Sequence, residues 1–399
     1  LRSFLDMDEK QVSFVPISIN YEKVLEGNSY VKEVMGAEKN QENLKDIFSV
    51  FRDFRNYLGE AYLQFGEPIN LNALLKEYPL SDYSSEKDWL FKVTPVLGKK
   101  IMTTINDSTV VTSTALFSLA ILNSDGFSIS NRELVSRIEL LKSLLEEDKY
   151  SPKTLVCEKT GEEIIDQMRK LGFLSKEGIN DRISLTNLEA AKLSFYRNNI
   201  SHLLIFESLI CGFFQYQKEI IKEDLLQSIK MIYPFLKEEF FLKWDEADLD
   251  QLINLKLNKL INKNLILEDS NNYKRPDFKS REFYETQSLG KLVQPSIDRF
   301  YVLISQLWKN SAEHISKNEL ERNSLEILKN LEKTQARLTP EFSEKWMFDV
   351  FLNRLIENKY VREDDKGMLY PTRITQRLEK DANKFLEPNW LKELSKSTT

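Results

Sequence analysis

The sequence predicts a mostly helical α+β protein with a partial α/β sheet at its N-terminus. Glycine and proline are scarce, at 12 and 11 in 399 residues, which disfavours a chain built from many tight turns. Apolar residues make up 41% and charged residues 30%, the usual balance for a protein with a buried core. Strand-like segments end near residue 70, and helical periodicity prevails from residue 85 onward. We therefore expect three parts, at 1–80, 81–220 and 221–399.

The N-terminal part has a strand, helix, strand pattern. Residues 12–19, VSFVPISI, are rich in β-branched side chains and predict a buried strand. Pro16 lacks an amide hydrogen, which places it at a sheet edge or a bulge. A helix over 39–56 and a second strand over 61–65 follow, an order typical of an α/β sheet. Two strands do not form a stable domain, so we expect this sheet to be part of a longer chain.

The rest of the chain carries helical patterns. The start of one helix is marked by a capping box of Ser130 and Glu133, and its apolar side chains share one face. Residues 110–122 are small and apolar, as expected for a helix packed on several sides. Residues 200–214 are more apolar still, but they are shorter than the roughly 20 residues that span a bilayer. We expect a buried helix there, with an interfacial helix as the alternative.

Three segments share a plan of an amphipathic helix followed by two short strands around a polar turn. They are residues 161–185, 249–275 and 349–372. This is the local plan of a winged helix, and recurring helix–hairpin units in an α-rich protein are the simpler interpretation. Nucleic-acid binding would need a basic recognition helix, whereas these helices carry mixed charge. The remaining alternative is a role in protein–protein contacts.

Composition excludes several classes of chemistry. The formal charge is −6, with 56 basic against 62 acidic residues, so no long-range field gathers nucleic acid. The sequence contains no GxxxxGK[ST], GxGxxG, HExxH or CxxC motif. Two histidines cannot build a His-rich metal site, and Cys157 and Cys211 cannot form a disulfide framework. We predict no catalytic residue, no metal site and no cofactor in this chain.

The two histidines are each followed five residues later by a glutamate. His202 precedes Glu207, and His314 precedes Glu319. In a helix the fifth residue projects away from the first, so neither pair is expected to touch. We interpret His202 as a satisfied core histidine and His314 as a surface residue.

Several segments together resemble one known family. They occur in the family's order and cover nearly the whole chain: FVPISINYEKV (14–24), YVKEVMGAEKNQE (30–42), YLQFGEPI (62–69), INDS (105–108), FYRNNISH (195–202) and YPFLKEEFFLKW (233–244). The chain resembles the C-terminal portion of the large bacterial membrane-bound glycerol-3-phosphate 1-O-acyltransferases. On this resemblance, residues 1–80 are the C-terminal remnant of the acyltransferase α/β domain.

The resemblance implies an activity in phospholipid synthesis. Family members transfer a fatty acyl group from acyl-CoA or acyl carrier protein to the 1-hydroxyl of glycerol 3-phosphate. A His-x₄-Asp motif supplies the base, because an alcohol attacks a thioester only as its proton is removed. That motif is absent from this sequence, so the chain alone is expected to be inactive. The family also implies peripheral attachment to the membrane surface, on the cytoplasmic face of the bacterial inner membrane.

The resemblance also suggests site residues. Pro16, Ser18 and Tyr21 match the block that lines the glycerol-phosphate side of the family's pocket; the alternative is that Pro16 shapes a strand edge and Tyr21 packs. Arg52 and Arg55 could reach a phosphate, although pairing with nearby aspartates is the simpler interpretation.

The YRNN segment suggests a structural role. Arg197, Asn198 and Asn199 precede an apolar helix, and we expect their buried hydrogen bonds to dock the helical region on the catalytic domain. The competing function class for the whole chain is a non-enzymatic, winged-helix-like scaffold or interaction module.

Overall fold

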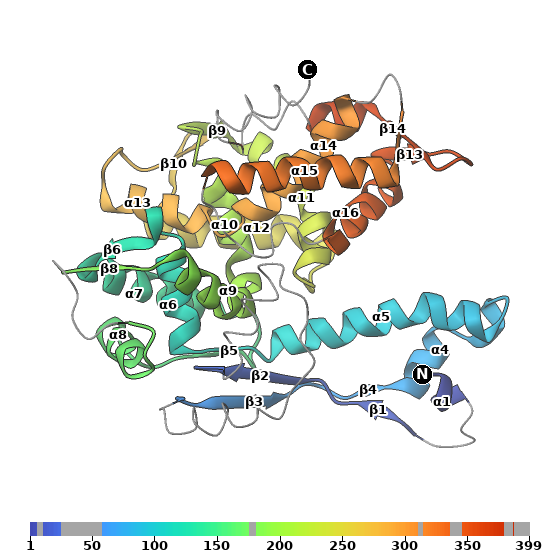
Figure 1. The fold of residues 1–399 in the computed structure, drawn as a ribbon, viewed down its shortest axis with the longest axis horizontal. Helices are drawn as coiled ribbons and strands as arrows, with labels where there is room; N and C mark the ends of the chain where they lie inside the picture. The colour runs from blue at the N-terminus through green and yellow to red at the C-terminus, as the bar shows by residue number, and fades with distance from the viewer. Residues whose placement is uncertain are drawn as a thin grey trace.

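The structure is a computed structural model that describes residues 1–5, 11–24, 58–174, 181–309, 314–335, 345–378 and 386. This part of the chain is mostly helical, as predicted, and its strands form small sheets of two or three strands. Figure 1 shows a helical body above a narrow strand ribbon. Among the described helices, none combines the length and the apolar run that crossing a bilayer requires.

The N-terminal strands form one antiparallel ribbon that is interrupted near its middle. Its inner half pairs β2 (Ile17–Tyr21) with β3 (Ala61–Phe65), and its outer half pairs β1 (Ser13–Phe14) with β4 (Ile69–Asn70). The strand predicted over 12–19 is therefore two strands, separated at Pro16. The prediction that it is buried is wrong for one face, because side chains along β2 alternate between exposed and buried. The helix predicted over 39–56 lies outside the described residues.

A small satellite core lies at the outer end of this ribbon. It is formed by three helices: α1 (Arg2–Leu5), α4 (Leu71–Glu77) and α5 (Glu86–Asp107). Its centre is Trp89, which is buried with Leu71 and Leu74 and whose Nε1 donates to the carbonyl of Tyr78 at 2.8 Å. The short 3₁₀ helix η1 (Leu80–Asp82) links α4 to α5. Along α5 the chain then returns to the main body (Figure 1).

The main body begins with a helix that is buried on all sides. A short strand, β5 (Val110–Val111), pairs in parallel with β7 (Leu155–Val156) and leads into α6 (Ser113–Leu122). Every residue of α6 is buried, which confirms the prediction for residues 110–122. The 3₁₀ helix η2 (Asp125–Phe127) follows.

The rest of the described chain falls into three consecutive units that share a core order of a strand, two helices and then one or two further strands. In the first unit, β7 lies between the two helices. The first consists of β6 (Ser128–Ser130), α7 (Asn131–Glu147), α8 (Gly161–Lys170), β8 (Arg182–Ser184), α9 (Asn187–Ser201), η4 (His202–Leu204) and α10 (Ile205–Phe213). The second consists of β9 (Glu219–Ile221), α11 (Lys222–Glu239), η5 (Glu246–Asp248), α12 (Leu249–Asn262), β10 (Leu267–Asp269), β11 (Asn272–Lys274), α13 (Arg281–Gly290) and α14 (Gln294–Lys309). The third consists of β12 (Ile315–Ser316), α15 (Lys317–Gln335), α16 (Lys345–Glu357), β13 (Val361–Glu363) and β14 (Met368–Pro371).

The units share their strand pairing as well as their order. In each, the first strand pairs antiparallel with the last: β6 with β8, β9 with β11, and β12 with β14. The hairpins predicted within 249–275 and 349–372 are confirmed as β10–β11 and β13–β14. In the first unit β8 pairs with β6, and residues 175–180, where the hairpin was predicted, lie outside the described part.

The second helix of each unit ends in the same way. The residue that closes it has a left-handed backbone in all three units: Gly172 (φ 76°), Asn264 (φ 56°) and Lys359 (φ 60°). The amide of the next residue then donates to a carbonyl five positions back, at 2.9, 2.9 and 2.8 Å. This is the Schellman cap. The cap therefore recurs at residues 172, 264 and 359, and the same cap also ends α11, where Phe241 has φ 50° and the amide of Leu242 donates to the Lys237 carbonyl at 3.0 Å.

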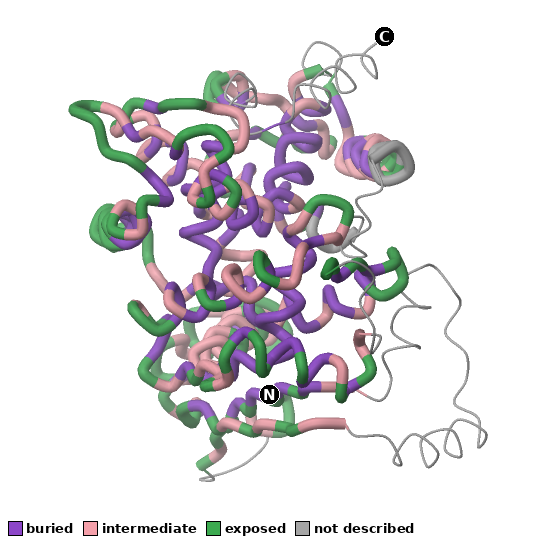
Figure 2. The backbone as a smooth tube through the Cα atoms, turned by 90° about the vertical axis from the view of Figure 1, so that its left-hand side faces the viewer, coloured by how far each residue is buried: buried purple, intermediate pink, exposed green. Residues whose placement is uncertain are grey.

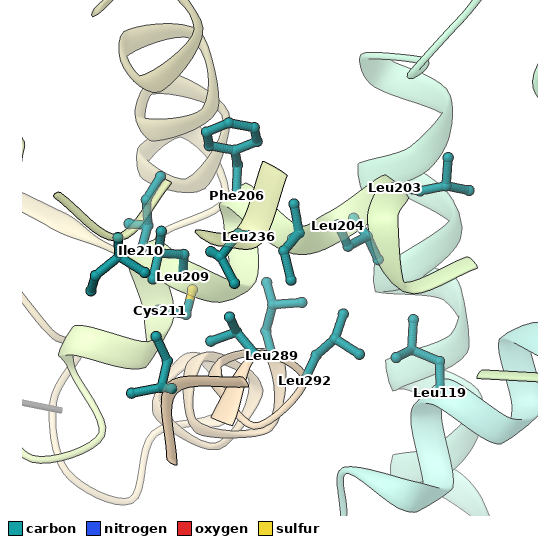
Figure 3. Packing of buried hydrophobic residues seen from close by; sticks show 14 of the residues in the cluster. Leu119, Leu203, Leu204, Phe206, Leu209, Ile210, Cys211, Leu236, Leu289 and Leu292 are labelled. Atoms are coloured by element: carbon teal, nitrogen blue, oxygen red, sulfur yellow. The ribbon is translucent and has the colours of Figure 1, made fainter. Parts of the chain in front are cut away.

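A single cluster of buried apolar side chains runs from Val111 to Leu386 and crosses the boundary predicted near residue 220. Figure 2 shows this buried backbone passing through the centre of the molecule. The segment predicted as a buried helix at 200–214 is buried throughout, and it is divided among the end of α9, η4 and α10. Figure 3 shows Leu204 and Leu209 in this cluster, together with Leu236 of α11 and Leu289 of α13. The three-part division of the chain stays a prediction.

Candidate functional site

The three residues predicted to lie near substrate do not share one face of the ribbon. Pro16 and Ser18 are buried against the helical body, whereas Tyr21 is exposed on the opposite face. Pro16 accepts a hydrogen bond from the amide of Gly66 at 2.8 Å through its carbonyl. At Gly66 a Cβ atom would meet Thr104 of α5 at 2.4 Å, so glycine lets the ribbon approach α5 closely. A substrate role for these residues stays a prediction.

The face of β2 that lies against the helical body is a row of polar side chains. We call Ser18, Asn20 and Glu22 the polar row; all three are buried. Asn20 Oδ1 accepts from Ser18 Oγ at 3.0 Å and from the amide of Val110 at 3.1 Å. Buried polar groups are stable when they are hydrogen-bonded, so this row fixes the ribbon on β5.

Glu22 is the most deeply buried member of the polar row, with none of its surface exposed. Its Oε2 accepts from Gln167 Nε2 at 2.6 Å, and its Oε1 lies 3.8 Å from Lys159 Nζ. Its carbonyl accepts from Thr114 Oγ1 at 2.7 Å. Gly59 has φ +72°, and a Cβ atom there would lie 2.6 Å from Glu22 Oε2. The carboxylate is therefore enclosed by side chains from the first helical unit.

The end of the same strand is tied to the YRNN segment of α9. The amide of Val24 donates to Tyr196 Oη at 2.9 Å, and Lys23 Nζ donates to the carbonyl of Leu171 at 2.6 Å. Arg197 is buried, and its Nε and Nη2 donate to Asn198 Oδ1 at 3.1 and 2.9 Å. Asn198 and Asn199 are half-buried. A docking role for Arg197, Asn198 and Asn199 stays a prediction, and Tyr196 makes the contact with the ribbon.

Three motif segments far apart in sequence meet at the end of α5. Asn106 Nδ2 donates to the carbonyl of Phe240 at 2.8 Å. His202 lies on the other side, with its Nε2 3.3 Å from the Asn106 carbonyl and 3.4 Å from Thr109 Oγ1. Segments 105–108, 195–202 and 233–244 therefore converge. We call this contact region the motif junction.

A lysine and aromatic rings close the motif junction. Lys243 Nζ donates to Asp107 Oδ1 at 2.8 Å and lies 4.4 Å from the centre of the Tyr150 ring. The Tyr150 ring meets His202 and Trp244 edge to face, with centroids 5.1 and 4.8 Å apart. Cation–π and edge-to-face ring contacts each contribute roughly 0.5–1.5 kcal/mol. The junction is therefore a structural brace between α5 and the second unit.

Neither histidine lies in an environment suited to a catalytic base. His202 is buried, and burial lowers its pKa to about 4, against a smaller opposing effect of the Asn106 carbonyl. Its interpretation as a satisfied core residue is confirmed. His314 is exposed and packs against Tyr370, while Glu319 caps a helix through Ser316. His314 is thus a surface residue, as predicted.

Among the described residues no three His, Cys, Asp or Glu side chains gather as a cation would require. Cys157 and Cys211 are both free, and burial raises the pKa of the Cys211 thiol. Arg52 and Arg55 lie outside the described residues.

Sequence reasoning missed the importance of Asn20 and Glu22. A usable signal was present, because polar residues recur at every second position of the strand, at 18, 20 and 22. Such a period of two marks one face of a strand. The pattern places Ser18, Asn20 and Glu22 on one face, but it does not tell whether that face is buried.

Replacing Asn20 with alanine tests the polar row. The change leaves the buried amide of Val110 without its acceptor, which is expected to lower the free energy of unfolding by about 1–3 kcal/mol. Urea unfolding followed by circular dichroism measures it. Asn271, exposed in a turn, is the matched control, and its alanine variant should change stability by no more than about 0.5 kcal/mol. Equal effects at the two positions would contradict the role of the polar row.

Comparisons with known proteins point to the same family as the motif segments. The model of a family described as the glycerol-3-phosphate acyltransferase C-terminal region matches residues 30–364. A glycerol-3-phosphate acyltransferase of Pseudomonas putida (strain GB-1) is 30% identical over 377 residues, which is 92% of this chain and 46% of that protein. One from Pseudomonas paraeruginosa (strain PA7) is 29% identical over 397 residues, covering 97% of this chain and 48% of the relative.

The chain spans about half the length of the curated relatives it matches. The resemblance inferred from the motif segments is confirmed, and the family match extends over most of the chain. The protein therefore belongs to the family of the glycerol-3-phosphate acyltransferase C-terminal region.

Proposed function

We propose that this chain is the C-terminal part of an enzyme that transfers a fatty acyl group from acyl-CoA or acyl carrier protein to the 1-hydroxyl of glycerol 3-phosphate. The observation that carries the proposal is the family match over residues 30–364. The relatives that bear the acyltransferase name are about twice as long as this chain. The catalytic base then belongs to the other half of the enzyme, and this chain alone is inactive.

In this proposal the chain holds the catalytic domain in place. Two features support it: the polar row joins the N-terminal ribbon to the first unit, and the motif junction braces α5 against the second. The β2–β3 ribbon would be the last part of the acyltransferase sheet. Pro16, Ser18 and Tyr21 would lie on the glycerol-phosphate side of the pocket, with Arg197, Asn198 and Asn199 supporting the docked domain.

We further propose that the enzyme works at the membrane surface, on the cytoplasmic face of the bacterial inner membrane. The product of acyl transfer to glycerol 3-phosphate is a lipid, which supports a location where that product enters the bilayer. Attachment would be peripheral, through apolar and basic helix faces.

A second candidate function is that of a non-enzymatic interaction scaffold. The shared plan of the units supports it, because the second and third units have a strand, helix, helix, hairpin order like the local plan of a winged helix. In a scaffold these units would contact other proteins. The mixed charge of the helices, such as Glu162 and Glu163 beside Arg169 and Lys170 in α8, argues against nucleic acid.

The DNA upstream of the codon for Leu1 decides between the two functions. We expect an open reading frame that encodes His-x₄-Asp and an acyltransferase domain. The protein from that longer frame should transfer radiolabelled palmitate from palmitoyl-CoA to glycerol 3-phosphate, while the 399-residue chain should not. A stop codon upstream, or a longer protein without this activity, would contradict the enzyme and favour the scaffold.

A further inference from the structure

The β2–β3 ribbon has its polar face inward and its apolar face outward. Facing away from the helical body are Ile17, Ile19, Tyr21, Leu63 and Phe65, which we call the apolar face; they are 40%, 46%, 40%, 57% and 63% exposed. Cross-strand pairing places Ile17 beside Phe65 and Ile19 beside Leu63. These side chains therefore form one continuous surface. Figure 1 shows the ribbon at the edge of the molecule, beneath β5 and α5.

This arrangement is the reverse of the usual one. An antiparallel sheet with one covered face normally buries its apolar side chains and exposes its polar ones. The orientation here is nevertheless specific, because shifting the register by one residue would exchange the two faces. The bonds of Asn20 to Val110 and of Glu22 to Gln167 hold the polar side inward. The outward direction of the apolar face is therefore part of the fold.

The edges of the β2–β3 ribbon carry no third strand in the described part of the chain. Within the described residues β2 pairs only with β3, and β3 only with β2. A strand edge presents unpaired amides and carbonyls to which further strands can add. An open edge beside an apolar face is what a strand at the margin of a larger sheet presents when the rest of that sheet is removed.

We propose that the apolar face is an internal interface of the longer enzyme, covered by the polypeptide that precedes this chain in its relatives. The inference rests on the proposed function and adds to it the surface through which the two halves join. The chain accounts for about half of each relative's length, and its family model is of a C-terminal region. The first strand of the ribbon, β1, begins at Ser13, and the N-terminus lies at the outer end of the ribbon beside α1 and α4 (Figure 1). The partner surface of the ribbon is apolar, because the apolar face carries no charged side chain.

Cysteine accessibility tests the interface. Ile19→Cys and Leu63→Cys report on the apolar face, and Phe91→Cys on α5, where Phe91 is 80% exposed, is the matched control. A Cys157→Ser background removes the more accessible native thiol, and Cys211 is fully buried. Each variant is made in the 399-residue chain and in the protein from the longer reading frame. Maleimide labelling rates are then compared.

In the longer protein, positions 19 and 63 should label at least about tenfold more slowly than position 91, since a covered residue reacts only when the structure opens. In the 399-residue chain all three should label at similar rates. Equal rates in the longer protein would overturn the proposal. So would protection in the 399-residue chain: protection lost on dilution would indicate a second copy, and protection gained only with phosphatidylglycerol vesicles would indicate a membrane contact.

Acyl transfer measured on the same preparations separates this inference from the proposed function. If the longer protein is active but positions 19 and 63 label rapidly, the proposed interface is wrong and the proposed acyltransferase function is supported. If the longer protein is inactive but both positions label slowly, the proposed interface is supported and the proposed acyltransferase function is wrong. The absence of an upstream reading frame overturns both.

Discussion

Replacing Glu207 with glutamine is expected to destabilise the protein by about 3–5 kcal/mol, the cost of leaving a buried charge without its partner. Glu207 lies on α10, at the centre of the helical body, and is 1% exposed. Its Oε1 lies 3.2 Å from Lys256 Nζ and contacts Lys259 Nζ, both on α12. Lys259 also donates to the carbonyl of Leu144 at 3.1 Å. One carboxylate thus joins α10 to α12, and α12 in turn holds α7.

The negative charge of Glu207 stabilises the two buried ammonium groups of Lys256 and Lys259. Burial alone would raise the pKa of Glu207, but Lys256 and Lys259 outweigh it and keep that pKa below its usual range. After the change to glutamine, Lys256 still has Asp148 at 2.5 Å. Lys259 keeps its hydrogen bond to the Leu144 carbonyl, but among the described carboxylates it then has only the more distant Asp148, at 3.9 Å. Its ammonium would then remain buried at a large cost in desolvation.

Urea unfolding of the 399-residue chain at pH 7 measures the effect. The control is Asp269→Asn, which removes the half-exposed pair with Lys274 and should cost no more than about 1 kcal/mol. The double variant Glu207→Leu, Lys259→Met should regain much of the lost stability, because a buried ion pair can be replaced by apolar groups. A loss at Glu207→Gln as small as the control's would show that this network does not hold the helices together.

Stability is expected to fall steeply in mild acid because of His202. The pKa of this histidine is lowered to about 4 by burial, with Lys243 adding to the effect, from an ordinary value of 6.5. As the pH drops below 6.5 the unfolded chain therefore takes up a proton that the folded chain refuses. The stability that the neutral histidine provides is complete above pH 6.5 and is lost as the pH falls toward 4. Between pH 7 and pH 5 the loss should be about 2 kcal/mol.

The His202→Gln variant isolates this contribution. Glutamine cannot take up the proton, so the variant should lose about 2 kcal/mol less than the wild-type chain between pH 7 and pH 5. Both proteins share the other titrating groups near the site, including Asp107 and Lys243. The difference between their urea midpoints at each pH is therefore the readout. Parallel pH profiles would contradict a buried neutral histidine in the motif junction.

Much of the fold could be predicted because its signals are local. The capping box of Ser130 and Glu133 is present as expected, since its partners are three residues apart. The apolar run of 200–214 is buried, as its composition required. The plan shared by 161–185, 249–275 and 349–372 was visible because each unit repeats the same helix end. Family membership was visible in the motif segments for the same reason: each is a short, continuous stretch of sequence.

What the sequence determined by itself was the mostly helical class, the start of the helix at Ser130, the burial of 200–214, two of the hairpins and the family. Tertiary structure alone decided which face of β2 is covered and which residues meet in the motif junction. The partners of Asn20 and Glu22 lie 90 and 145 residues further along the chain, and Asn106 meets Phe240 across 134. An alternating strand pattern distinguishes two faces but does not state which one is buried. That choice depends on hydrogen-bond partners in β5 and α8, which are distant in sequence, so it exists only in the folded molecule.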